Sequence, residues 1–140
     1  MRADLAVAMA LITGPPVPGY VFTTPSAIAL GNMAPGTTAT GNSTDGSLVG
    51  DNGNGYIVTG IDAKLTYKGY MVSGTDVLAS KHQISNEDAN YVNADTAKTF
   101  LDTLVPTNEV IALYVSQLVA YTDAMATGYT ITITFTVTEK

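Results

Sequence analysis

The feature that most constrains this sequence is residues 129–138, a strictly alternating run close to the C-terminal end. Threonine occupies every even position of the run. A period of two is that of a β-strand with one apolar face and one hydroxyl-bearing face. Such a strand is typical of an antiparallel sheet that covers a core on one side and meets water on the other. We therefore expect these apolar residues to point inward: Tyr129, Ile131, Ile133, Phe135 and Val137.

The composition indicates a folded protein with an unusually uncharged surface. Hydrophobic residues make up 46% of the 140 residues, which argues against disorder. Charged residues make up only 13%, against about 25% in an average soluble domain. The 21 threonines and 13 glycines therefore supply much of the polar surface. This balance is typical of cell-surface proteins, and we expect an extracellular or cell-surface location.

Three classes of function are disfavoured by composition. The net charge is −6 and the six basic residues are scattered, so the chain has no basic stripe for nucleic acid. The absence of cysteine excludes disulfides and thiolate metal sites. The longest apolar run, residues 5–12, is far shorter than the roughly 20 residues that a membrane span needs. We expect no membrane insertion of the mature chain.

The chain divides into an N-terminal arm, residues 1–19, and a body, residues 20–140. Large apolar residues alternate with small ones in the arm, which favours a strand, although a helix that is apolar all round remains the alternative. Residues 14–19 contain three prolines and are expected to form a stiff, extended spacer. The large apolar positions of the arm are Leu5, Val7, Met9 and Leu11.

The body is predicted to consist of short strands separated by glycine-rich turns. We expect strands at residues 20–23, 27–30, 56–58 and 63–67. A longer strand is expected over residues 110–121, with a break of phase at Leu118 that indicates a bulge or a strand covered on both faces. Residues 86–98 are the one stretch with helical character. The fold class is therefore an all-β antiparallel sandwich with at most one short helix.

The best candidate metal ligands are Asp51, Asn52 and Asn54, which alternate oxygen donors with glycine in the manner of part of a calcium loop. The same residue types are also common in tight turns. The bidentate glutamate that a calcium loop carries further along the chain is missing at the required spacing. Calcium is therefore the one candidate cofactor, and none other is expected. Asn42 begins the chain's one N-glycosylation sequon, in a glycine-rich stretch, so a glycan is a candidate modification.

No catalytic constellation is evident, and we expect a protein without enzymatic activity. His82 is the only histidine, and it has neither a cysteine nor a paired acid at ligand spacing. A structural or solvated role is expected for it. The serines show no nucleophile-elbow context, and the acidic residues between 87 and 109 are expected to form a solvated face.

Parts of the body resemble the immunoglobulin-like β-sandwiches of prokaryotic, notably archaeal, cell-surface proteins. The resembling segments are residues 28–38, 68–74 and 119–137. The strand on a proline spacer resembles filament subunits that use donor-strand complementation, such as the TasA-like bundling pili of archaea. That resemblance implies an N-terminal strand that leaves its own body and completes the sheet of the next subunit.

The first functional hypothesis is therefore a structural subunit of an extracellular filament, whose partners are copies of itself. Its donor strand would present Leu5, Val7, Met9 and Leu11 to the neighbouring copy. Two alternatives stay open. One is a surface-attached module that binds glycan or protein through its loops, and the other is a virion protein with a β-sandwich fold.

Overall fold

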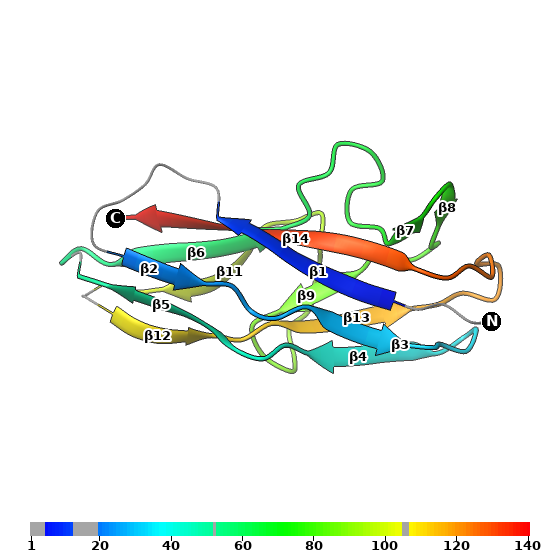
Figure 1. The fold of residues 1–140 in the computed structure, drawn as a ribbon, viewed down its shortest axis with the longest axis horizontal. Helices are drawn as coiled ribbons and strands as arrows, with labels where there is room; N and C mark the ends of the chain where they lie inside the picture. The colour runs from blue at the N-terminus through cyan, green and yellow to red at the C-terminus, as the bar shows by residue number, and fades with distance from the viewer. Residues whose placement is uncertain (1–4, 13–19, 52, 105–106) are drawn as a thin grey trace.

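The chain folds into a two-layer β-sandwich, which confirms the predicted fold class (Figure 1). The computed structural model describes residues 5–12, 20–51, 53–104 and 107–140. Among these residues all regular structure is β-strand, and none is helix. Figure 1 shows β6 and β14 along one long side of the molecule and β5, β12, β4 and β13 along the other.

The first layer is a sheet with the order β11-β6-β14-β1-β3, and the short strand β7 also pairs with β14. Its central strand β14 runs antiparallel to β6 and parallel to β1, while β1 runs antiparallel to β3. The strands are β1 (Leu5–Ile12), β3 (Ile28–Gly31), β6 (Tyr56–Ile61), β7 (Val72–Ser73), β8 (Asp76–Val77), β11 (Lys98–Asp102) and β14 (Tyr129–Glu139).

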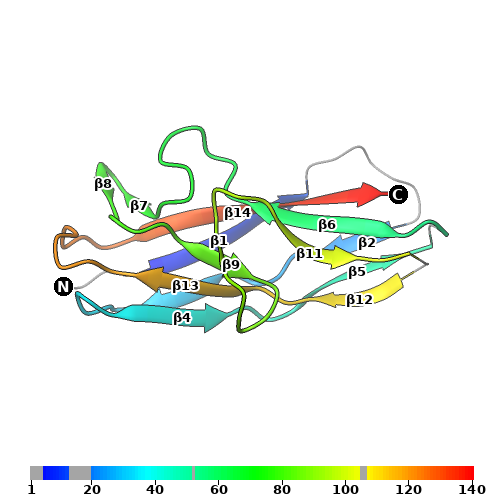
Figure 2. The ribbon, with the colours of Figure 1, turned by 180° about the vertical axis from the view of Figure 1, so that it is seen from behind.

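The second layer consists of two sheets, β10-β9-β13-β4 and β12-β5-β2, and Figure 2 shows β9, β13 and β4 side by side in this layer. The chain runs directly from β4 into β5 and from β12 into β13, so the two sheets continue one another across a bend. At the bend, the Ser43 amide donates to the Leu113 carbonyl at 2.9 Å, and the Leu113 amide donates to Ser43 Oγ at 3.3 Å. The strands are β2 (Tyr20–Thr23), β4 (Thr38–Asn42), β5 (Gly46–Gly50), β9 (Gln83–Ser85), β10 (Val92–Asn93), β12 (Thr107–Ile111) and β13 (Tyr114–Leu118).

The alternation of residues 129–138 is confirmed to reflect a β-strand with one buried and one outward face. Every odd position of β14 from Tyr129 to Val137 is buried, and the threonines between them are exposed or half-buried. Strand β1 is also confirmed as a strand rather than a helix. A single alternating strand therefore provides one wall of the core and one outer face of the sandwich.

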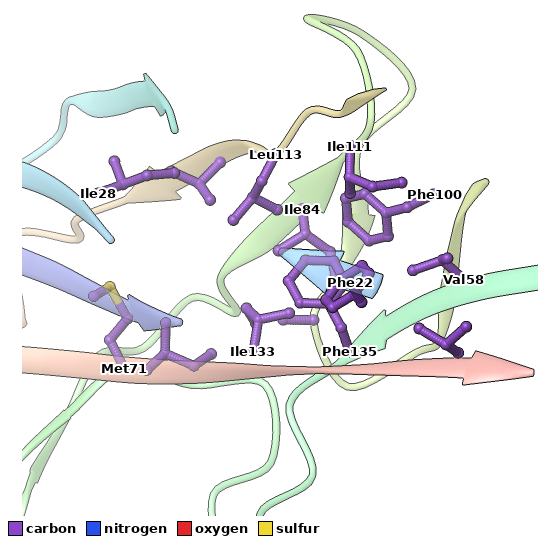
Figure 3. Packing of buried hydrophobic residues seen from close by; sticks show 14 of the residues in the cluster. Phe22, Ile28, Val58, Met71, Ile84, Phe100, Ile111, Leu113, Ile133 and Phe135 are labelled. Carbon is purple, nitrogen blue, oxygen red and sulfur yellow. The ribbon is translucent and has the colours of Figure 1, made fainter. Parts of the chain in front are cut away.

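Three phenylalanines join the layers at the centre of the core (Figure 3). Phe135 of β14 lies 5.0 Å from Phe100 of β11 and 5.9 Å from Phe22 of β2, measured between ring centroids. Phe22 belongs to the second layer, so this contact ties the two layers together. Gly60 leaves the space that these rings need, because a Cβ there would lie 2.7 Å from the Phe100 ring.

The predicted helix at residues 86–98 is wrong. These residues instead contain the tight connection from β9, the short strand β10 and the turn that leads into β11. Asn90 has a positive φ of 51°, and Ser85 Oγ donates to the Ala89 carbonyl at 2.5 Å. Such local side-chain bonds to the backbone compete with helix formation.

Two of the predicted strands also differ from the structure. Residues 63–67 form a loop rather than a strand, because the buried Asp62 carboxylate accepts bonds from the amides of Lys64 at 3.0 Å and Gly69 at 2.7 Å. Residues 110–121 contain two strands, β12 and β13, separated by the bend at Leu113. Alternation continues through that bend, so Leu118 does not break phase but faces outward, 43% exposed.

Truncating Phe135 tests the assignment of the core. Phe135→Ala should lower the free energy of unfolding by about 3–5 kcal/mol, because a fully buried ring that joins both layers is lost. Thr134→Ala, on the outward face of the same strand, should cost well under half of that. Urea unfolding followed by circular dichroism measures both. Equal losses for the two variants would contradict this packing.

Candidate functional site

The candidate site is the groove between β14 and β3, which β1 fills in the single chain. Residues of β1 from Leu5 to Met9 pair in parallel with residues from Tyr129 to Ile133. On its other edge, Ala6 and Val7 of β1 pair antiparallel with Ala29 and Ile28 of β3. Within the described residues β1 is the sole ladder partner of β3. Removing β1 would therefore leave the backbone amides and carbonyls of both neighbours unpaired along the groove.

The strands that border the groove carry apolar residues that are almost fully buried. Ile28 of β3 is 5% exposed, and Tyr129, Ile131 and Ile133 of β14 are at most 1% exposed. The Tyr129 hydroxyl donates to the Ala124 carbonyl at 2.9 Å, so its polar end is satisfied while its ring stays in the core. An occupant of the groove must therefore supply both backbone hydrogen bonds and apolar cover.

The register of β1 puts the predicted donor residues in a defined order. Leu5, Val7 and Met9 lie opposite Tyr129, Ile131 and Ile133, which are the core-facing positions of β14. The register then shifts, and Ile12, rather than Leu11, pairs with Phe135. The side chains of these β1 residues, and the spacer at residues 14–19, lie outside the described part of the structure. Simple alternation along the arm does not reveal a bulge, so the sequence alone does not indicate that Ile12 pairs with Phe135.

The candidate calcium ligands lie in the connection between β5 and β6. Asp51 and Asn54 are both exposed there, and Asn52 lies outside the described residues. Among the residues that are described, no group of three or more histidine, cysteine, aspartate or glutamate side chains could hold a metal ion.

The sequon asparagine, Asn42, ends β4 and is exposed. Its ladder partner is Tyr114 of β13, and its Nδ2 donates to the Ser43 carbonyl at a long 3.4 Å. The next residue, Ser43, is buried in the bend described above. Asn42 therefore sits at the rim of a regular sheet rather than in a glycine-rich loop.

His82 belongs to a buried polar cluster that the sequence did not reveal. Gln117 Nε2 donates to the carbonyls of Ser80 at 3.1 Å and Leu118 at 2.8 Å, so its Oε1 faces His82 Nδ1 at 3.1 Å. Because that oxygen can only accept, His82 carries its proton on Nδ1. Its Nε2 is then an unprotonated nitrogen, fully buried and without a hydrogen-bond partner.

Burial lowers the pKa of His82 from 6.5 to about 4. Desolvation is the largest cause, and the nearby Lys64 lowers the pKa further. The hydrogen bond to Gln117 and the charge of Asp62 act in the opposite direction. The imidazole is thus held neutral at physiological pH, as a structural group with no exposed nitrogen for general acid–base chemistry.

The neutral His82 should make the fold sensitive to acid. Because its pKa is lower in the folded state, its contribution is full above pH 6.5 and is lost as the pH falls toward 4. The loss should reach about 3 kcal/mol of unfolding free energy. The difference in stability between wild type and His82→Gln, from urea titrations at pH 7, 5.5 and 4, should therefore shrink as the pH falls. A difference that is constant with pH would contradict the assignment.

Comparisons with known proteins do not assign a family. Neither a scan of the sequence against models of protein families nor a search of curated proteins found a match. The described residues contain no helix that is long and apolar enough to cross a membrane. In the absence of a family match, a function can be inferred only from the structure itself, and the groove between β14 and β3 is the feature used for it.

Proposed function

We propose that this chain is a structural subunit of an extracellular filament, in which β1 of one copy fills the groove between β14 and β3 of the next. One observation carries the proposal. Strand β1 is paired on both edges inside the first layer, and residues 13–19 join it to the body that begins with β2.

Exchange of β1 between copies costs little free energy, because the backbone hydrogen bonds of β1 are the same in either arrangement. A β1 strand from a neighbour would make the same ladders with β14 and β3 as the chain's own strand does. The equilibrium between β1 bound in its own chain and β1 bound in a neighbour is then set by protein concentration and by the geometry that residues 13–19 allow. Residues 13–19 include Pro15, Pro16 and Pro18, which favour extended geometry and reach at most about 25 Å. An extended connection favours a strand that leaves its own body.

The proposed contact is of the type that builds fibres. The donor surface is β1 and the acceptor surface is the groove, so the two surfaces are different. A contact between unlike surfaces is head-to-tail, and it propagates as a filament unless rotation closes a ring. A low content of charged residues and a high content of threonine suit a protein exposed to the medium outside the cell.

Disulfide trapping tests the exchange, because the chain has no cysteine of its own. Ala6 and Thr130 are ladder partners, and adjacent strands lie about 4.8 Å apart, within the range that a disulfide spans. An equal mixture of the single variants Ala6→Cys and Thr130→Cys should give a covalent dimer on a non-reducing gel, because a disulfide between the two variants can form only between chains.

The matched control replaces the acceptor with Thr138→Cys, which pairs with Ile57 and lies beyond the β1 ladder. That mixture should stay monomeric. If the double variant Ala6→Cys/Thr130→Cys closes only within one chain, at concentrations where negative-stain images show fibres, β1 is not the connector. A chain that lacks residues 1–13 should form no fibres.

Assembly should depend only weakly on salt, because the proposed contact is made of backbone hydrogen bonds and apolar burial. Surface ion pairs are worth about 0–1 kcal/mol each, and few basic residues are present to form them. Raising sodium chloride from 0.1 to 1 M should change the polymerising concentration, measured by sedimentation, by less than about twofold. Complete disassembly by salt alone would count against this mode of assembly.

A further inference from the structure

A row of polar side chains crosses the outer face of the sheet β10-β9-β13-β4. Ser116 at its centre pairs with Thr40 on one side and with Gln83 on the other, and Gln83 pairs in turn with Asn93. The neighbours of these residues along the strands, Val115 and Ile84, are fully buried, so the row lies on the face away from the core. Four strands carry it over about 14 Å.

The row lies in a hollowed surface. Ser116, Gln83 and Asn93 line a groove of about 410 Å³, together with Ser80, Lys81 and Leu118. A smaller hollow of about 120 Å³ is lined by Thr40, Asn42, Tyr114 and Asp88. Because Thr40 and Ser116 are ladder partners, the two hollows adjoin on one face.

The groove offers hydroxyl and amide groups with little net charge. Gln83 Nε2 donates to Asn93 Oδ1 at 3.4 Å, a long bond that leaves the Gln83 carbonyl oxygen and the Asn93 amide for a ligand. Of the described residues that line the larger groove, only Lys81 is charged. Lys81 Nζ already lies 2.6 Å from Asp95 Oδ2 and 5.8 Å from the centre of the Tyr70 ring. The Lys81 ammonium group is therefore paired within the protein and is not available to bind an anionic ligand.

Apolar surface borders the polar row. Leu118 is 43% exposed at the edge of the groove, and the half-buried Tyr114 lines the smaller hollow. Asp88 in the smaller hollow accepts a hydrogen bond from the Tyr91 hydroxyl at 3.0 Å, and its carboxylate would repel an anionic ligand. Neutral hydroxyl and amide groups beside apolar carbon match a ligand that combines many hydroxyls with C–H faces.

From this combination we infer that the outer face of the sheet β10-β9-β13-β4 binds a neutral saccharide. Gln83 and Asn93 bond its hydroxyls, and Leu118 packs on its C–H face. The site belongs to the second layer, whereas β1 and its groove belong to the first. Saccharide binding is therefore independent of the proposed polymerisation.

Affinity electrophoresis with neutral polysaccharides tests the inference. The full chain is run through native gels that contain mannan, a β-glucan or a galactan, and through a gel that contains dextran sulfate. At least one neutral polymer should retard the wild type. The double variant Gln83→Ala/Asn93→Ala should bind that polymer at least tenfold more weakly, since it loses the two amides that face the ligand.

The control variant is Thr132→Ala, an exposed polar residue on the outer face of the first layer, which should be retarded as the wild type is. Thermal unfolding by circular dichroism verifies that all three proteins are folded. Retardation by none of the neutral polymers overturns the inference, as does retardation by dextran sulfate alone. Unchanged retardation of the double variant overturns it as well.

Discussion

The structure depends on the pairing and alternation of β14. One edge of this strand pairs with β6 and β7, and the other pairs with β1, so it connects the two halves of its sheet. Its odd-numbered side chains form the wall of the core that Phe22 meets from the opposite layer. A slip of one residue would expose all of these apolar side chains at once, because the side-chain period of a strand is two. The register of β14 is therefore strongly specified.

The same strand is central to the proposed exchange of β1. Strand β1 lies at the second edge of β14, and in the part of the chain that the structure describes β3 pairs with the sheet through β1 alone. A strand that is bonded on both edges but connected through one proline-rich segment can be supplied by its own chain or by a neighbour, with the same hydrogen bonds. Whether the chain's own β1 or a neighbour's β1 fills the groove depends on residues 13–19 and on protein concentration, because the groove binds both strands in the same way.

The two layers present different outer surfaces. The first layer carries the threonine face of β14 and the proposed connector, while the outer face of the sheet β10-β9-β13-β4 carries a polar row and a groove whose one lining charge is paired. A filament built through the first layer would leave that groove open on each subunit. The proposed assembly and the proposed saccharide site are thus compatible in one molecule.

Elements in which a local pattern is repeated many times could be predicted from the sequence. The alternation of residues 129–138 predicts β14 and its buried face, and the arm predicts β1 as a strand. Other features became visible only in the folded molecule. The turn around Asn90 replaced an expected helix, and the carboxylate of Asp62 turned an expected strand into a loop. The row from Thr40 to Asn93 joins four strands, and the bonding of His82 depends on Gln117, 35 residues away. The turn and the loop depend on side-chain bonds to nearby backbone, which hydrophobic periodicity does not reveal. The polar row and the His82 cluster arise from pairing between distant segments, whose register is set by packing of the whole sandwich rather than by neighbours along the chain.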